Sequence, residues 1–340
     1  MIDRGANGTV LVALLGLLLL AGCRGGGTTP ESGGEPAAAE RPRTLTIYSG
    51  RNEKLIGPLL ERFESASGID VDVRYASTSE LAATLMEEGE RTPAALFIAQ
   101  DAAALGALSA AALLSEIPAA TLERVAPRYR SPRGDWVGLS GRARTVVYNT
   151  ELISESDLPQ QLSAALDPRY RGKFGLAPNN ASFQAHMAAY GALNGEAALN
   201  ELLAGLAANE PKVYPKNTPI VEAVIAGEIE WGFVNHYYLL RALAETPDAS
   251  AKNFVMPTAD GSDFLNIAGA GLLRETEPAL ELLEFLVADE AQRYFREETF
   301  EYPLVDGSPG GTSQVDFAEV SAMLETTLGL IRDSQLARFQ

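Results

Sequence analysis

The sequence predicts an α/β fold in two lobes, each with a central, mostly parallel sheet that helices flank. Three observations predict it. Strand-like and helix-like stretches alternate from residue 44 onward, as expected for parallel strands joined by helices. The composition of the 340 residues, 46% hydrophobic and 21% charged, is that of a globular chain with a large core. Two segments, Gly138–Asn149 and Phe264–Leu273, are candidates for strands that cross between the lobes.

The alternation is clearest in the first part of the chain. It consists of a strand at Thr44–Gly50, a helix within Asn52–Gly68, a strand at Ile69–Tyr75, a helix after Ser79 and a strand at Ala94–Asp101. The crossing stretches then predict one lobe from 44–143 plus about 265–318 and a second lobe from 144–264. Residues 319–340 have the apolar spacing of a C-terminal helix that packs on the outside.

In such sheets, ligands bind where the carboxyl ends of strands lead into helices. Five loops have this position: Ser49–Asn52, Ala99–Ala102, Pro178–Ser182, Pro215–Pro219 and Val234–Tyr238. The last contains adjacent tyrosines, Tyr237 and Tyr238, between the strand "EIEWGFV" and the helix "YLLRALAE". In an extended strand two neighbouring rings would point to opposite faces, but at a strand-to-helix junction they can converge.

The N-terminus predicts export and a lipid anchor. Val10–Ala21 is apolar and short, like the core of a signal peptide, and it leads into "LAGC", which resembles a bacterial lipobox. Cys23 is the only cysteine, so we expect residues 1–22 to be a signal peptide and Cys23 to carry the lipid. The Gly- and Pro-rich residues 23–43 predict a flexible tether to the outer face of the cytoplasmic membrane.

Charge and residue usage exclude other classes of function. The formal net charge of −18, without basic clusters, argues against a nucleic-acid partner. The two histidines leave few candidates for acid–base catalysis, and no nucleophile–base constellation lies in the candidate loops, so we expect a binding protein and no enzyme.

The tyrosine pair by itself has two interpretations. Phenolate oxygen is a hard, anionic ligand that suits a hard, trivalent ion such as Fe(III), which can displace a phenol proton of pKa near ~10. Adjacent tyrosines also occur as packed or stacking aromatics. On the residues alone, an organic solute held between the rings stays an alternative.

The order of several motifs narrows these alternatives. "LTIYSGRNEKLIGPLLERFE", "GIDVDVRY", "WVGLSGRARTVVYN", "YRGKFGLAPNNASF", "YPKNTPIVEAVIAGEIEWGFVNHYYLL" and "EYPLVDG" follow one another across residues 44–310. In this order they resemble the ferric-ion-binding proteins of bacterial ABC importers. The resemblance implies a type II periplasmic-binding-protein fold with a ligand cleft between the lobes. It also implies a monomeric receptor that captures Fe(III) and delivers it to an ABC permease and its ATPase.

The resemblance also implies roles for individual residues. Tyr237, Tyr238 and Tyr148 match tyrosine ligands of the metal, and Asn180, Ser182, Asn217 and Asn235 match residues that hold a synergistic anion such as carbonate. The chain departs from many members, which have histidine and glutamate ligands where Asn52 and Gln100 stand here. Asn52 and Gln100 carry neutral amides, which are poor ligands for Fe(III), and are candidates for a weak ligand or for a hydrogen bond to a ligand. Asp101 is a candidate for a fourth ligand or for a hydrogen-bond acceptor near the metal, and a helix N-cap is its alternative role. The anion then needs a cation, for which Arg142, Arg144 and Arg51 are candidates. The loss of both ligands keeps open an alternative cargo, an organic solute such as a polyamine, thiamine or a phosphonate.

Overall fold

The structure of the protein is a computed structural model that describes residues 43–305 and 315–339. These residues belong to one compact unit, Pro42–Gln340. Residues 1–42, where a signal peptide, a lipid on Cys23 and a tether are expected, lie outside the described residues. Among the helices in the described ranges, none has the length and apolar character needed to cross a bilayer.

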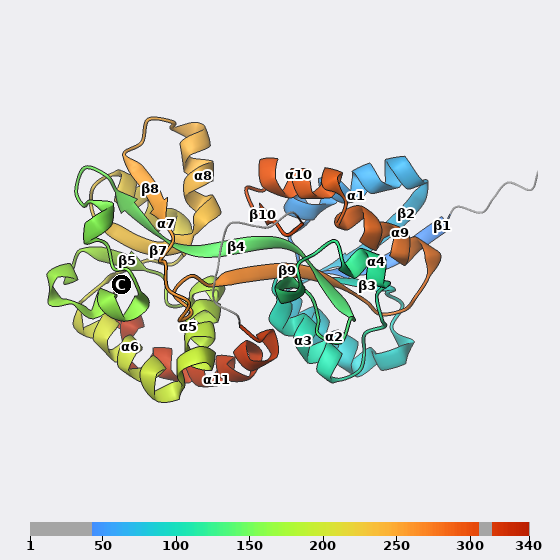
Figure 1. Ribbon diagram of the computed structural model, residues 1–340, viewed down its shortest axis with the longest axis horizontal. Helices are drawn as coiled ribbons and strands as arrows, with labels where there is room; N and C mark the ends of the chain where they lie inside the picture. Colours follow the sequence, from blue (N-terminus) through green and yellow to red (C-terminus); the bar gives the residue numbers. More distant parts are fainter. Residues whose placement is uncertain (1–42, 306–314, 340) are drawn as a thin grey trace, which may run out of the picture. The chain divides into compact units, whose positions relative to one another are not determined.

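Strands and helices alternate as predicted (Figure 1). The first part comprises β1 (Arg43–Ser49), α1 (Glu53–Ser67), β2 (Ile69–Tyr75), α2 (Thr78–Glu88), β3 (Leu96–Ala99), α3 (Ala102–Ala110), α4 (Ala119–Leu122) and β4 (Trp136–Asn149). The middle part comprises β5 (Phe174–Leu176), α5 (Ala181–Asn194), α6 (Glu196–Ala208), β6 (Lys212–Val213), α7 (Asn217–Ile225), β7 (Trp231–Asn235), α8 (His236–Glu245) and β8 (Ala251–Phe254). The last part comprises β9 (Leu265–Leu272), α9 (Glu277–Leu286), α10 (Asp289–Glu297), β10 (Tyr302–Pro303) and α11 (Phe317–Asp333).

The sheet is parallel toward its ends and antiparallel at its centre. Its order is β2-β1-β3-β9-β4-β7-β5-β6, and β8 and β10 also pair with β4. β1 pairs in parallel with β2 and β3, and β5 pairs in parallel with β6 and β7. The two long strands β4 and β9 run antiparallel to each other (Figure 1). Parallel neighbours require crossover helices, which is why each end of the sheet alternates strand and helix in the sequence.

The strand β4 passes from one hydrophobic core into another. Its residues Val137, Leu139 and Ala143 pack with β1, β3, β9, α1, α9 and α10. Its later residues Val146 and Tyr148 pack with β5, β7, α5 and α6. All fourteen residues of β4 are buried, and they include the two arginines Arg142 and Arg144. Helix α11 packs against both α3 and α5.

Local sequence signals set the ends of the elements around the candidate loops. Asn52 caps α1 by accepting a hydrogen bond from the Lys54 backbone N–H, and Gly68 ends that helix with φ of 68°. Asp101 and Asn180 cap α3 and α5 in the same way. Helix α8 begins at His236, directly after the last residue of β7, so Tyr237 and Tyr238 lie in its first turn.

Candidate functional site

The rings of Tyr237 and Tyr238 lie face to face at the start of α8. Their centroids are 4.4 Å apart and their planes differ by 29°. Tyr237 is 9% exposed and Tyr238 is half-buried. The strand-to-helix turn therefore does what an extended strand could not do, and brings two consecutive phenols together.

Beside the tyrosines, one buried arginine gathers residues from three helix starts. Arg144 lies opposite Asn235 in the register of β4 and β7. Its Nη1 donates hydrogen bonds to Ser182 Oγ at 3.1 Å, Asn217 Oδ1 at 3.2 Å and Asn235 Oδ1 at 3.0 Å. Asn180 Oδ1 accepts from Ser182 Oγ at 2.6 Å and from Asn217 Nδ2 at 3.2 Å. The structure thus brings together Arg144 and the four residues predicted to hold an anion.

This cluster carries positive potential. The first turns of α5, α7 and α8 contribute Ser182, Asn217 and the tyrosines, and helix N-termini favour negative charge. Arg144 is 1% exposed, and neither its Nε nor its Nη2 has a hydrogen-bond partner in the part of the chain that the structure describes. Two charged donors are thus available for a ligand that accepts hydrogen bonds.

The same burial shifts the ionisation of the cluster. Burial lowers the pKa of Arg144 to about 10, while the neighbouring Tyr237 and Tyr238 act in the opposite direction. Burial, and next the adjacent Tyr237, raise the pKa of the Tyr238 phenol, although Arg241 and a hydrogen bond with Asn217 act to lower it. Tyr238 therefore keeps its proton at neutral pH unless a strongly charged cation displaces it.

Tyr148, the third tyrosine that matches a metal ligand of the family, does not lie in this cluster. It lies four residues beyond Arg144 along β4, a distance of about 13 Å at the rise of a strand. It pairs with Trp231 at the far end of β7, and its hydroxyl donates to Glu155 Oε2 at 3.2 Å. The sequence motif placed Tyr148 on the correct strand, but the register of that strand carries it into the core.

The other candidate cations have partners of their own. Arg51 forms a buried ion pair with Glu301 at 3.0 Å and donates to Ser140 Oγ at 3.1 Å, so it is not available to an anion. Arg142, which shares a strand with Arg144, donates from Nη2 to the Gln100 carbonyl oxygen. Of the three predicted arginines, only Arg144 contacts the predicted anion-binding side chains.

The two loops that lost the histidine and the glutamate carry helix caps. Asn52 is exposed and its Oδ1 accepts from the Lys54 N–H at 2.9 Å. Asp101 Oδ1 accepts from the Ala104 N–H at 3.4 Å. Gln100 presents a buried Oε1 that has no partner among the described residues. The described residues also contain no cluster of three or more His, Cys, Asp or Glu side chains that could hold a metal.

Two residues that the sequence analysis did not assign to the site also contact it. The guanidinium of Arg241 lies 4.7 Å from the centroid of the Tyr237 ring, and its Nη2 donates to the Thr299 carbonyl at 3.4 Å. Arg241 is four residues after Tyr237, and this helical spacing is the signal that could have identified it. His236 Nδ1 accepts from the Ala143 N–H at 3.2 Å, and its ring stacks on Tyr302 at 4.1 Å.

Comparison with known proteins places this chain in a family. Residues 92–318 match the family model of bacterial extracellular solute-binding proteins. The major ferric iron-binding protein of Neisseria meningitidis serogroup A is 33% identical over 277 residues, which cover 79% of this chain and 82% of the relative. The Fe(3+)-binding periplasmic protein of Serratia marcescens is 29% identical over 291 residues, 84% of this chain and 86% of the relative.

Solved structures of iron-binding proteins also superpose on this chain. Iron-bound HitA from Pseudomonas aeruginosa superposes with a TM-score of 0.73 at 29% identity, over 87% of this chain and all of HitA. A Trichodesmium protein in complex with iron and citrate superposes with a TM-score of 0.74 at 25% identity, over 86% of this chain and 99% of that one.

These comparisons confirm the two-lobed, type II periplasmic-binding-protein fold predicted from the sequence. They also confirm that the chain is a solute-binding protein and not an enzyme. The family match and the relative that is 33% identical confirm the resemblance to ferric-ion-binding solute-binding proteins that the motifs indicated, and the chain belongs to the bacterial extracellular solute-binding proteins.

Proposed function

We propose that this protein binds Fe(III) as its cargo through the phenolates of Tyr237 and Tyr238, together with a small anion that Arg144 holds. The observation that carries the proposal is the stacked pair of phenols beside a buried arginine with two unpartnered donors. The names of the relatives from Neisseria and Serratia, which describe ferric iron binding, support the same cargo.

The charges of such a site balance. Two phenolates and one carbonate dianion carry four negative charges, which offset the three charges of Fe(III) and the one of Arg144. Carbonate, or a similar small anion, accepts hydrogen bonds from Nε and Nη2 of Arg144 and from the first turn of α5. Buried charges are tolerated when they are paired in this way. Gln100 and Asp101, in the loop after β3, are candidates for a hydrogen bond to the ion's water or anion.

The two hydrophobic cores suggest how the protein closes over its cargo. We propose that residues 44–143 with about 265–318, and residues 144–264, act as lobes that close over the ion by bending at β4 and β9. Arg241 and His236 support this proposal, because each contacts residues of the first lobe from helix α8 of the second. Closure excludes water from the ion, and the closed form is then the one that an ABC permease with its ATPase recognises.

The N-terminal sequence completes the proposal. A lipid on Cys23 and the tether that follows it would hold the monomeric protein at the outer face of the cytoplasmic membrane, within reach of the permease. Metabolic labelling with a radioactive fatty acid tests this anchor. Label on the parent protein that is absent from Cys23→Ser supports it, and equal label on both proteins refutes it.

An absorption spectrum tests the ferric site. Because residues 42–340 form a compact unit, the chain from residue 24 onward is suitable. Ferric citrate with bicarbonate should give a visible tyrosinate-to-iron band, and Tyr237→Phe combined with Tyr238→Phe should abolish it. Tyr148→Phe is the matched control and should retain the band. A band that persists in the double variant would refute the proposed ligands.

The same experiment distinguishes Fe(III) from an organic solute as the cargo. No visible band in the parent protein would favour an organic ligand that uses the two rings as stacking surfaces. Of the organic solutes considered, a phosphonate suits the free donors of Arg144, whereas polyamines and thiamine are cations that this arginine repels.

A further inference from the structure

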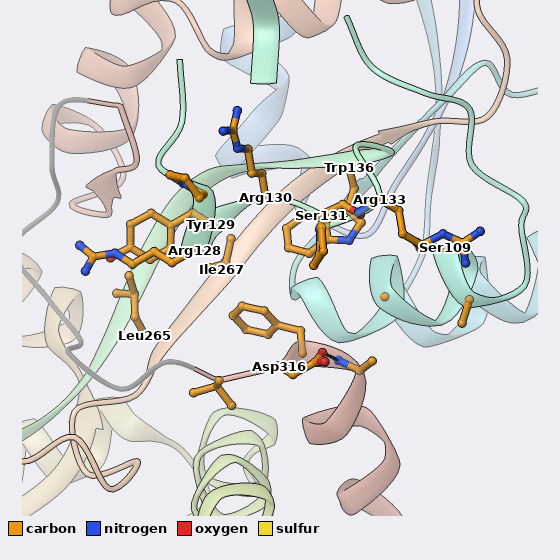
Figure 2. Close-up of a pocket in the computed structure, with 17 residues that line it drawn as sticks. Ser109, Arg128, Tyr129, Arg130, Ser131, Arg133, Trp136, Leu265, Ile267 and Asp316 are labelled. Atoms are coloured by element: carbon orange, nitrogen blue, oxygen red, sulfur yellow. Dashed lines mark hydrogen bonds between the residues drawn. The ribbon is translucent and has the colours of Figure 1, made fainter. Parts of the chain in front are cut away.

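A pocket of about 440 Å³ is shown in Figure 2. It is bounded by α3, by the segment 127–133 ahead of β4, by the strands β4 and β9, and by the first turn of α11. None of the residues placed at the tyrosine site lines it. Its size falls within the range of about 300–1,000 Å³ that is usual for pockets that bind small organic molecules.

The interior of this pocket is apolar and aromatic. Trp136, Leu265, Ile267 and Phe317 line it, and each is at most 8% exposed. The rings of Trp136 and Phe317 meet edge to face with centroids 6.2 Å apart. Such a surface favours the hydrocarbon part of a ligand, because burial removes that part from water.

Three arginines surround this apolar interior. Arg128, Arg130 and Arg133 all line the pocket, and Figure 2 shows their guanidinium groups at its periphery. None of the three forms an ion pair among the residues that the structure describes. Among the described residues that line the pocket, the only acidic side chain is that of Asp316, whose Oδ1 already caps α11 by accepting from the Ala318 N–H at 2.8 Å. The mouth is thus locally cationic in a chain of formal net charge −18.

The segment that carries the arginines is held in place before any ligand arrives. Asp135 is 5% exposed, and it accepts hydrogen bonds from Ser131 Oγ and, at 2.6 Å, from Ser109 Oγ of α3. The backbone of Gly138 approaches the segment so closely that an added Cβ would lie 2.6 Å from the Tyr129 carbonyl oxygen. A prebuilt pocket loses little conformational freedom on binding, which favours a specific ligand.

We propose that this pocket binds an amphipathic organic anion, specifically a free straight-chain carboxylate of medium length. The hydrocarbon chain lies against Trp136, Leu265 and Ile267, and the carboxylate lies at the rim among the arginines. Guanidinium groups bind carboxylates through paired N–H donors, which sets this class apart from neutral and cationic ligands of similar shape.

Decanoate is the probe that tests the proposal, with two matched controls. Acetate has the charge without the hydrocarbon chain, and decanol has the chain without the charge. The chain contains two tryptophans, and Trp231 is fully buried against Phe174 in the other core, so Trp136 is the fluorescent reporter of the pocket. Decanoate should shift the emission saturably, and acetate and decanol should not. Titration calorimetry on the same protein supplies a readout that does not depend on either tryptophan.

Variants locate the binding. Replacing Arg128, Arg130 and Arg133 together by glutamine should raise the Kd for decanoate at least tenfold. Arg124→Gln is the matched control with no expected effect, because the Arg124 side chain donates instead to the Val287 carbonyl and to Asp289. Ala318→Leu adds bulk to the lining without changing charge and should also weaken binding.

Three results would overturn the proposal. They are the absence of saturable decanoate binding, equal binding of decanol, and an unchanged Kd in the triple arginine variant. The ferric absorption band is measured separately, so failure here leaves the proposed iron site untouched.

Discussion

The variant Arg144→Met separates the role of Arg144 in binding from any role in folding. Methionine has a similar length, so the change removes the charge and the donors while it preserves much of the volume. In the structure Arg144 is 1% exposed, it has no carboxylate partner among the described residues, and its Nε and Nη2 have no hydrogen-bond partner there. An arginine that serves a ligand, and not the fold, should show this arrangement.

The structure gives the expected size of the change in ferric affinity and of the change in stability. Two charge-assisted hydrogen bonds to an anion contribute about 1.5–3 kcal/mol each, so their loss should weaken ferric binding in bicarbonate by roughly 100- to 10,000-fold. The stability of the ligand-free protein should change by less than about 2 kcal/mol, because relief of a buried, unpaired charge offsets the donors that Ser182, Asn217 and Asn235 lose.

Competition with citrate, followed through the tyrosinate band, measures the affinity, and urea unfolding of the ligand-free protein measures the stability. Arg142→Met is the matched control on the same strand. It should change ferric affinity by less than about tenfold, because the Arg142 side chain donates to the Gln100 carbonyl and not to the anion-binding side chains. If Arg144→Met lost several kcal/mol of stability and kept its ferric affinity, the reasoning would be wrong.

Three further variants test other parts of the structure. Tyr148→Phe should leave ferric affinity unchanged; a large loss would return Tyr148 to the ligand set. Glu301→Gln should cost about 3–5 kcal/mol in urea unfolding because it breaks a buried ion pair, whereas Glu298→Gln at an exposed pair should cost under about 1 kcal/mol; equal effects would contradict this. Arg241→Gln should speed iron release about three- to tenfold, because it removes a cation 4.7 Å from the Tyr237 ring; unchanged release would exclude Arg241 from closure.

The buried carboxyl of Glu301 also gives stability a pH dependence. Burial acts to raise its pKa, but Arg51, Arg142 and the hydrogen bonds with Ser140 and Arg51 outweigh burial and lower it. A carboxyl whose pKa is lower in the folded state stabilises the protein above its unfolded pKa of about 4.3. Urea midpoints should therefore fall as the pH drops below that value. The drop should be smaller in Glu301→Gln, and equal drops in both proteins would refute this origin.

The sequence by itself determined the local elements and the chemistry at their ends. Alternating strands and helices gave the α/β class, because buried parallel strands need apolar runs and crossover helices. The position of Tyr237 and Tyr238 between a strand and a helix was evident from the residues themselves. These features depend on a few neighbouring residues, which is why the sequence reports them directly.

Only the tertiary structure decided which of these local features meet. The register of β4 against β7 placed Arg144 opposite Asn235 and carried Tyr148 into the core, although both residues belong to one motif. The pairing of Arg51 with Glu301 joins residues 250 positions apart and removed one candidate cation. Strand register and long-range partners depend on how distant segments pack, so no local pattern in the sequence could have settled them.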